Sequence, residues 1–150
     1  MTETDVKNFF ERIRKQRGYK ESLEQERKEV WSDIGTVKAI DYEKARVTGG
    51  SQSDIGRMLE RAHERCDQVD KEIVKAIEEL NRLRGHAHEL LLLCDNELQR
   101  GILIDRYLRY MQWNVISEKY HYSENQLFRI RNDACKSIAA NAHDSLLERQ

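Results

Sequence analysis

The middle of the chain carries apolar residues at alternating spacings of three and four, which is the pattern of one long amphipathic helix. The series extends without a break from Leu59 to Cys94, and charged residues fill most of the other positions. This heptad seam predicts a helix on the order of 50 Å long, at about 1.5 Å per residue, that packs against a partner helix. We expect the seam to associate two chains through Leu59, Ala62, Cys66, Val69, Ile73, Ala76, Leu80, Leu83, Ala87 and Leu90.

Residues 3 to 40 show the same helical spacing of apolar side chains, among them Phe10. This segment predicts a second helix that packs against the first in the same chain, so that residues 1 to 95 form a long antiparallel helical hairpin. Polar positions interrupt the middle of this helix, and we expect fraying or a kink near Gly18. Paired glycines and small hydroxyl residues predict that the hairpin loop lies at 41 to 53.

Three short apolar runs at helical spacing occupy residues 102 to 138 and predict three helices that share a small core. The third run opens with Ser123, and Gln126 follows three residues later, which is the pattern of a capping box at a helix start. His121 and Tyr122 separate the second run from the third, so the connection must be a tight turn. The spacing therefore predicts a helix-turn-helix.

These patterns predict an all-α chain of two domains, with the hairpin at 1 to 95 and the helix-turn-helix at 96 to 150. The seam changes register after Cys94, which a change of packing partner would produce. We expect the joint between the domains to lie at 95 to 101, with Gly101 as a candidate for its marker. A helix that continues through this joint is the alternative.

If Leu127, Ile130, Ala134 and Ile138 face the core, the opposite face of the third helix is rich in side chains that read DNA. Asn and Gln can pair with adenine, Arg with guanine, and an apolar ring can meet a thymine methyl group, while Lys holds phosphates. An ordinary solvated face is the alternative interpretation. The candidate DNA-binding residues are Lys119, Ser123, Glu124, Asn125, Gln126, Phe128, Arg129, Asn132 and Lys136.

An ungapped set of motifs spans residues 106 to 134. It consists of Arg106-Tyr107-Leu108, Trp113, Ile116 and Glu118, Ser123, and then Leu127, Arg129, Ile130 and Ala134. With these residues, the last third of the chain resembles region 4 of sigma-70-type factors and, more closely, the phage late transcription regulators of the ArpU and RinA type. The resemblance implies a phage- or prophage-encoded regulator that binds double-stranded DNA, activates late genes and contacts RNA polymerase.

The chain departs from that pattern at three positions. Tyr110 and His121 stand where glycine is usual, and Ser117 replaces a small alanine. The turn between the helices is therefore either wider than usual or holds His121 at positive φ, which histidine tolerates better than most residues.

The charge balance predicts that DNA is bound by a local surface. There are 26 Lys plus Arg against 27 Asp plus Glu, so the chain is not of the strongly basic type that coats nucleic acid. Between residues 107 and 136, five basic residues oppose three acidic ones. This modest excess predicts weak non-specific affinity and favours help from dimerisation or from RNA polymerase.

Several function classes are disfavoured by the sequence. It carries neither a membrane-spanning stretch nor a signal-peptide pattern, and its three cysteines fall on predicted seams, so we expect a soluble protein in the cytoplasm of a bacterial host. The five histidines and three cysteines form no recurrent ligand set and no nucleophile-base pair. We therefore expect no metal, no cofactor and no enzymatic activity.

Two alternatives to a transcriptional regulator stay open. The near-neutral charge suits a coiled-coil structural adaptor whose C-terminal helices bind protein. A small terminase-like subunit for DNA packaging would also combine a helix-turn-helix with oligomerising helices, although such subunits usually place the DNA-binding module first.

Overall fold

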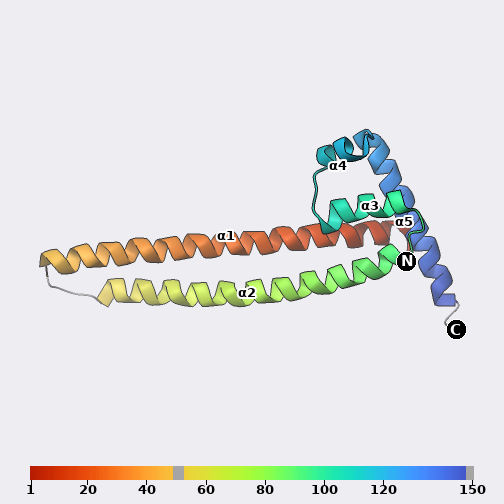
Figure 1. Ribbon diagram of the computed structural model, residues 1–150. Helices are drawn as coiled ribbons and strands as arrows, with labels where there is room; N and C mark the ends of the chain where they lie inside the picture. The colour runs from red at the N-terminus through yellow and green to blue at the C-terminus, as the bar shows by residue number, and fades with distance from the viewer. Residues whose placement is uncertain (49–52, 148–150) are drawn as a thin grey trace. The chain divides into compact units, whose positions relative to one another are not determined.

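The computed structural model describes residues 1–48 and 53–147, and over these residues the chain is helical, without a β-strand. The elements, in chain order, are α1 (Glu3–Thr48), α2 (Ser53–Leu92), α3 (Glu97–Leu103), the π-helix η1 (Ile104–Leu108), α4 (Trp113–Tyr120) and α5 (Glu124–Leu147) (Figure 1). The predicted all-α class is confirmed for the described part of the chain. None of the described helices holds a stretch long and apolar enough to cross a membrane.

The chain divides into two compact units that cut across α1 and α2. Unit 1 comprises Met1–Arg17 and Glu79–Gln150, and unit 2 comprises Gly18–Glu78. The first turns of α1 and the last turns of α2 bury their apolar side chains in the same core as α5. The compact units therefore do not follow the boundary expected between residues 95 and 96.

In unit 2, α1 and α2 run side by side in opposite directions (Figure 1). Leu23 of α1 packs with Val69 and Ala76 of α2 in a small buried cluster. Two exposed ion pairs flank this cluster, Arg27–Asp70 and Arg65–Glu26. Ion pairs at the surface contribute little to stability, so apolar burial provides most of the association between the two helices.

The heptad seam of α2 is covered within the chain itself. Its members Cys66, Val69, Ala76, Leu80, Leu83, Ala87 and Leu90 are buried, and Leu59, Ala62 and Ile73 are half-buried. In unit 2 the seam packs with Leu23, and in unit 1 it packs with Val6 and Phe10. Most of the seam is therefore covered by α1 of the same chain, and the association of two chains stays a prediction. Helical spacing specifies a buried face, but it does not say whether the neighbour belongs to the same chain.

The first helix is longer than its apolar pattern predicted. It continues through Gly18 and through residues 41–48, which the sequence assigned to a loop. Residues 43 to 46 are Glu, Lys, Ala and Arg, all good helix formers, and this propensity explains the extension. The paired glycines at 49 and 50 lie outside the described residues.

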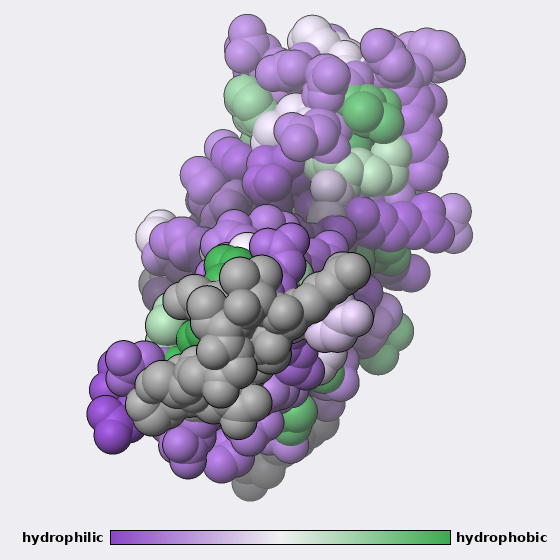
Figure 2. Space-filling view, turned by 90° about the vertical axis from the view of Figure 1, so that its left-hand side faces the viewer, coloured by the Kyte–Doolittle hydropathy of each residue, from purple (hydrophilic) through white to green (hydrophobic). Residues whose placement is uncertain are grey.

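On the face shown in Figure 2 the surface is mostly hydrophilic, with separate apolar areas.

The main core of unit 1 joins segments that are far apart in sequence. The rings of Phe10 in α1 and Tyr107 in η1 lie 5.3 Å apart between centroids, and both side chains are fully buried. The same core contains Val6 and Ile13 of α1, Leu83, Ala87 and Leu90 of α2, and Ala134, Cys135 and Ile138 of α5. Burial of a large apolar side chain stabilises the fold by about 1.5–3 kcal/mol. The first turns of α1 are therefore an integral part of unit 1.

A smaller core holds α3, α4 and α5 together. The sequence predicted one small core for residues 102 to 138, but Tyr107, Leu108, Ala134 and Ile138 of this segment pack in the main core instead. The buried members of the smaller core are Ile102, Ile116 and Leu127, one from each helix. Half-buried side chains close its edges, namely Leu98, Met111, Trp113, Tyr120, Tyr122 and Ile130. This packing fixes the direction of α4 and α5 relative to α3.

The break between the long helix and the C-terminal helices lies at residues 93–96, which includes the boundary expected between residues 95 and 96. Helix α2 ends at Leu92, and the side chain of Asn96 caps α3 by accepting from the backbone N–H of Gln99 at 3.1 Å. Gly101 lies inside α3 and does not mark the joint. A Cβ atom at Gly101 would stand 2.9 Å from the hydroxyl oxygen of Tyr120, so glycine here permits a close approach of α4.

Candidate nucleic-acid interface

The turn between α4 and α5 is closed by a residue in the left-handed conformation. His121 follows α4 with φ 58° and ψ 36°. The hydroxyl of Ser117 donates to the backbone oxygen of Tyr122, which ties the end of α4 to the turn. Of the two alternatives for this turn, the structure has the positive φ at His121. Ser117, where an alanine was expected, supplies a hydrogen bond that alanine could not make.

The start of α5 has the capping box that the sequence predicted. The Ser123 hydroxyl oxygen accepts from the backbone N–H of Gln126 at 3.2 Å, and the Gln126 side-chain oxygen accepts from the backbone N–H of Ser123 at 2.9 Å. Both residues therefore satisfy backbone groups at the helix start. The two side chains fix the start of α5, and the side-chain oxygen of Gln126 is already engaged in a hydrogen bond.

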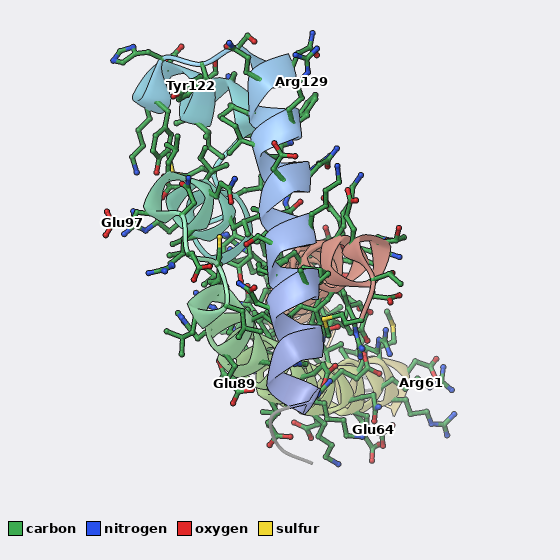
Figure 3. The ribbon with its side chains drawn as sticks, turned by 90° about the vertical axis from the view of Figure 1, so that its right-hand side faces the viewer. Arg61, Glu64, Glu89, Glu97, Tyr122 and Arg129 are labelled. Atoms are coloured by element: carbon green, nitrogen blue, oxygen red, sulfur yellow. The ribbon has the colours of Figure 1, made fainter. Side chains whose placement is uncertain are left out.

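The side chains of α5 divide into a buried face and an exposed face. Leu127, Ala134 and Ile138 are buried, as predicted, and Ile130, which was expected on the same face, is half-buried. On the other side, Asn125 and Arg129 are exposed, one helical turn apart, and neither side chain makes a hydrogen bond or ion pair within the described part of the chain. Figure 3 shows Arg129 near the N-terminal end of α5, with Tyr122 in the preceding turn. Glu124 and Lys136 are also exposed.

Three of the predicted DNA-binding residues are occupied by contacts inside the unit. The ring of Phe128 packs edge-on against Trp113, with centroids 5.1 Å apart, so it is half-buried and does not project alone. The side-chain oxygen of Asn132 accepts from Arg131 at 3.2 Å. Lys119 donates to Asp105 at 2.6 Å. These three residues thus make contacts within the unit that the sequence did not indicate, and their role in binding DNA stays a prediction.

A buried carboxylate organises the helices behind the exposed face. Asp105 in η1 is 1% exposed, and it accepts from Arg109 at 3.0 Å, Lys119 at 2.6 Å and the Tyr120 hydroxyl at 2.9 Å. Burial raises the pKa of Asp105, but the hydrogen bonds from Lys119 and Tyr120, together with the positive charges, outweigh it and hold the pKa below its usual value. Asp105 therefore stays ionised and links η1 to α4.

A second residue with positive φ joins the connection after η1 to the first helix. Tyr110 has φ 63°, and the Arg17 guanidinium lies 3.8 Å from the centroid of its ring. Arg84 lies 5.7 Å from the same centroid and donates to the backbone oxygen of Leu108 at 3.2 Å. Cation–π contacts of this kind stabilise the position of the Tyr110 ring. Tyr110, where a glycine was expected, provides these contacts, which glycine could not.

Sequence reasoning missed these supporting residues because their partners are distant in the chain. Asp105 and Arg109 are spaced as a helical ion pair, which is a local signal. Lys119 and Tyr120 lie fourteen and fifteen residues from Asp105, and Arg17 is far from Tyr110, so no local pattern connects them. Among the described residues, no group of three or more His, Cys, Asp or Glu side chains could hold a metal ion.

Comparison of the chain with known protein families, with curated proteins and with solved structures finds no match.

Proposed function

We propose that the protein binds double-stranded DNA in a sequence-specific manner and that α5 is its recognition helix. The observation that carries this proposal is the exposed, unengaged pair Asn125 and Arg129 on the first turns of a firmly anchored helix. An α-helix fits the major groove of B-form DNA, where Arg pairs bidentately with guanine and Asn with adenine. Two side chains one turn apart on one helix can address neighbouring base pairs.

The arrangement around this pair supports a helix-turn-helix interpretation. Helix α4 and helix α5 are joined by a short turn and share the core around Ile116 and Leu127. A docked recognition helix needs such a rigid frame, since its N-terminal residues must reach base edges without losing their orientation. Under this proposal unit 1, which includes the first turns of α1 and the last turns of α2, carries the recognition helix.

The resemblance of residues 106 to 134 to sigma region 4 and to the ArpU and RinA type favours a transcriptional regulator over the other classes. On this basis we propose a prophage-type late-gene activator that touches RNA polymerase. With the α2 seam covered by α1, a dimer would need another surface. A protein-binding adaptor would not require an unengaged Asn125 and Arg129 at the start of α5.

Selection of bound fragments from a random DNA pool tests the proposal and reports the symmetry of the site. The recognition variant is Asn125→Ala with Arg129→Ala. The control variant is Arg61→Ala with Asn81→Ala, which removes the same residue types from exposed positions on α2. Each good bidentate contact is worth about 1–3 kcal/mol of discrimination, so the recognition variant should lose about thirtyfold or more of its preference for the selected sequence.

The expected result is a selected sequence bound by the wild type and by the control variant, with the preference lost in the recognition variant. An unchanged preference in the recognition variant, with its helical fold intact by circular dichroism, would remove α5 as the reading helix. Light scattering on the same samples addresses assembly. A ring of eight or more chains would instead favour DNA packaging.

A further inference from the structure

One side of the helix pair in unit 2 is marked by contacts between α1 and α2. The Trp31 and His63 rings lie 6.4 Å apart between centroids, and the Arg27 guanidinium lies 6.0 Å from the centroid of the Trp31 ring. Arg27 also forms its ion pair with Asp70 on this side. We call the side on which Arg27, Trp31, His63 and Asp70 meet the lateral face. Residues at helical spacing from these four extend it along both helices.

The lateral face exposes large apolar side chains. Trp31 is 55% exposed, and Tyr42, eleven residues and three turns later, is 73% exposed. On α2, Val74 follows His63 by eleven residues and is 55% exposed, and Ile77 follows Asp70 by seven residues and is 39% exposed. Four of the seven large apolar side chains exposed in the described part of unit 2 therefore lie on one side of the helix pair.

The contact between α1 and α2 also buries little beyond Ile34. Ile34 and Cys66 are buried, but of the side chains that the structure describes between residues 35 and 65 none is buried. Val37, Ile55 and Leu59 are half-buried there. Helices in proteins are stabilised mostly by the packing of an apolar face. Two helices alone do not provide a complete core in this part of unit 2, and a second pair of helices would.

The charges of the lateral face differ between its two helices. On α1 the charged residues between Arg27 and Tyr42 on this side are Arg27 and Lys38, which lies seven residues after Trp31. On α2 they are Asp70 and the carboxylates that flank His63, Glu60 and Asp67. The side chains of Lys38, Glu60 and Asp67 are exposed and make no hydrogen bond or ion pair within the described part of the chain. The α1 half is thus positive and the α2 half negative.

We propose that the lateral face binds the lateral face of a second copy of the chain, with α1 of each copy on α2 of the other. Two copies can meet face to face about a two-fold axis in two ways. An axis along the helices places the positive half on the negative half. An axis across the helices places each half on itself, which brings like charges together. Charge complementarity therefore selects the first arrangement, a parallel bundle of four helices.

The contacts at Trp31 and His63 fix which charges meet, since these two residues lie at the same height along the helix pair. Arg27 and Asp67 are both four residues from them in one direction, so they meet across the two copies. In the other direction Lys38 is seven residues from Trp31 and Glu60 three from His63. At about 1.5 Å per residue this leaves an offset of about 6 Å, which a lysine and a glutamate side chain can cover.

The first test compares Trp31→Ala with Ile40→Ala in the full chain by sedimentation velocity over a concentration series. Ile40 lies nine residues after Trp31, on the opposite side of α1, and is 47% exposed. The wild type and Ile40→Ala should form dimers with similar dissociation constants. Trp31→Ala should raise the dissociation constant about thirtyfold or more, because a large aromatic side chain is lost from both halves of the interface. Circular dichroism checks that each variant keeps its helical content.

The second test exchanges charges that have no partner within the described part of the chain. Lys38→Glu and Glu60→Lys, each alone, place like charges together twice in a parallel dimer and should raise the dissociation constant about tenfold. An equimolar mixture of the two variants should recover dimers of wild-type stability. In a mixed dimer each of the two contacts again joins a carboxylate to an ammonium group.

A wild type that stays monomeric throughout the series would overturn the proposal, as would equal effects of Trp31→Ala and Ile40→Ala. A mixture that does not recover would overturn the arrangement of α1 on α2. The inference goes beyond the proposed function and does not depend on it. If the chain dimerises in this way but selects no DNA sequence, only the proposed function fails; if a monomer selects one, only the dimer fails.

Discussion

Replacement of the buried carboxylate by an amide, Asp105→Asn, should destabilise the protein substantially. Asp105 is 1% exposed and accepts three hydrogen bonds, two of them from cations. The amide keeps the shape of the side chain but loses the negative charge and one acceptor oxygen. Its NH₂ group would face one of the donors that now point at the carboxylate.

The size of the effect follows from the exposure of the partners. A hydrogen bond to a charged group is worth about 1.5–3 kcal/mol. The side chains of Arg109 and Lys119 are 64% and 41% exposed, so water can replace much of what they lose. The half-buried Tyr120 hydroxyl is less able to recover its partner. We therefore expect a loss of about 2–4 kcal/mol in the free energy of unfolding, or about 5–15 °C in Tm for a chain of this length.

The assay is thermal unfolding followed by circular dichroism, with Asp133→Asn as the matched control. Asp133 is an exposed carboxylate on α5, and one of its oxygens lies 4.0 Å from the Lys136 ammonium. Its replacement should change the free energy of unfolding by less than about 0.5 kcal/mol. If the free energy of unfolding of Asp105→Asn also lies within about 0.5 kcal/mol of the wild-type value, the carboxylate does not organise these helices.

The pH dependence of stability provides a second test of the role of Asp105. Because the pKa of Asp105 in the fold is below its usual value of 3.8, its stabilising contribution is present above that value and is lost as the pH falls toward the lowered pKa. The difference in Tm between the wild type and Asp105→Asn should therefore be constant near neutral pH and shrink below about pH 4. A difference that grows on acidification would contradict this account.

Three further substitutions test the local backbone. His121→Gly should raise the free energy of unfolding by about 0.5–1 kcal/mol, because glycine adopts the positive φ of 58° without strain, and a higher midpoint in urea at unchanged slope would show it. Tyr110→Gly, at a φ of 63°, should instead lower stability, because the ring between Arg17 and Arg84 is lost; a rise would contradict the cation–π assignment. Gly101→Ala should lower the free energy of unfolding by about 1–3 kcal/mol, because the added Cβ atom would lie too close to the Tyr120 hydroxyl oxygen. In a Tyr120→Phe background this cost should fall, and a double-mutant cycle without coupling would argue against the contact.

Local signals were enough to predict much of the candidate site. The capping box at Ser123 and Gln126 depends on residues three apart, and the positive φ at His121 depends on the turn between two adjacent helices. The buried face of α5 follows from helical spacing alone. Each of these features is decided by side chains within one or two helical turns, so a single sequence contains the information.

Features decided by distant partners were beyond the same reasoning. A seam such as that of α2 states that one face is buried, but the covering helix could belong to the same chain or to another, and the spacing is identical in both cases. Asp105 resembles any surface carboxylate in the sequence, and its burial depends on Lys119 and Tyr120 folding back over it. The role of α1 in unit 1 likewise depends on Phe10 meeting Tyr107, nearly a hundred residues away.

The composition of unit 1 leaves the electrostatic argument for DNA binding where the recognition segment put it. Between residues 107 and 136 alone, five basic residues oppose three acidic ones, an excess of two that predicted weak affinity. The first seventeen residues add five basic and three acidic residues to the same compact unit, but residues 79–106 and 137–150 together add five basic and seven acidic ones, so the excess over unit 1 stays at two. Phosphate contacts and counterion release depend on the cations that a docked duplex meets, whatever their order in the chain. Under the proposed function, affinity therefore depends on where the cations of unit 1 lie on its surface and not on its net charge.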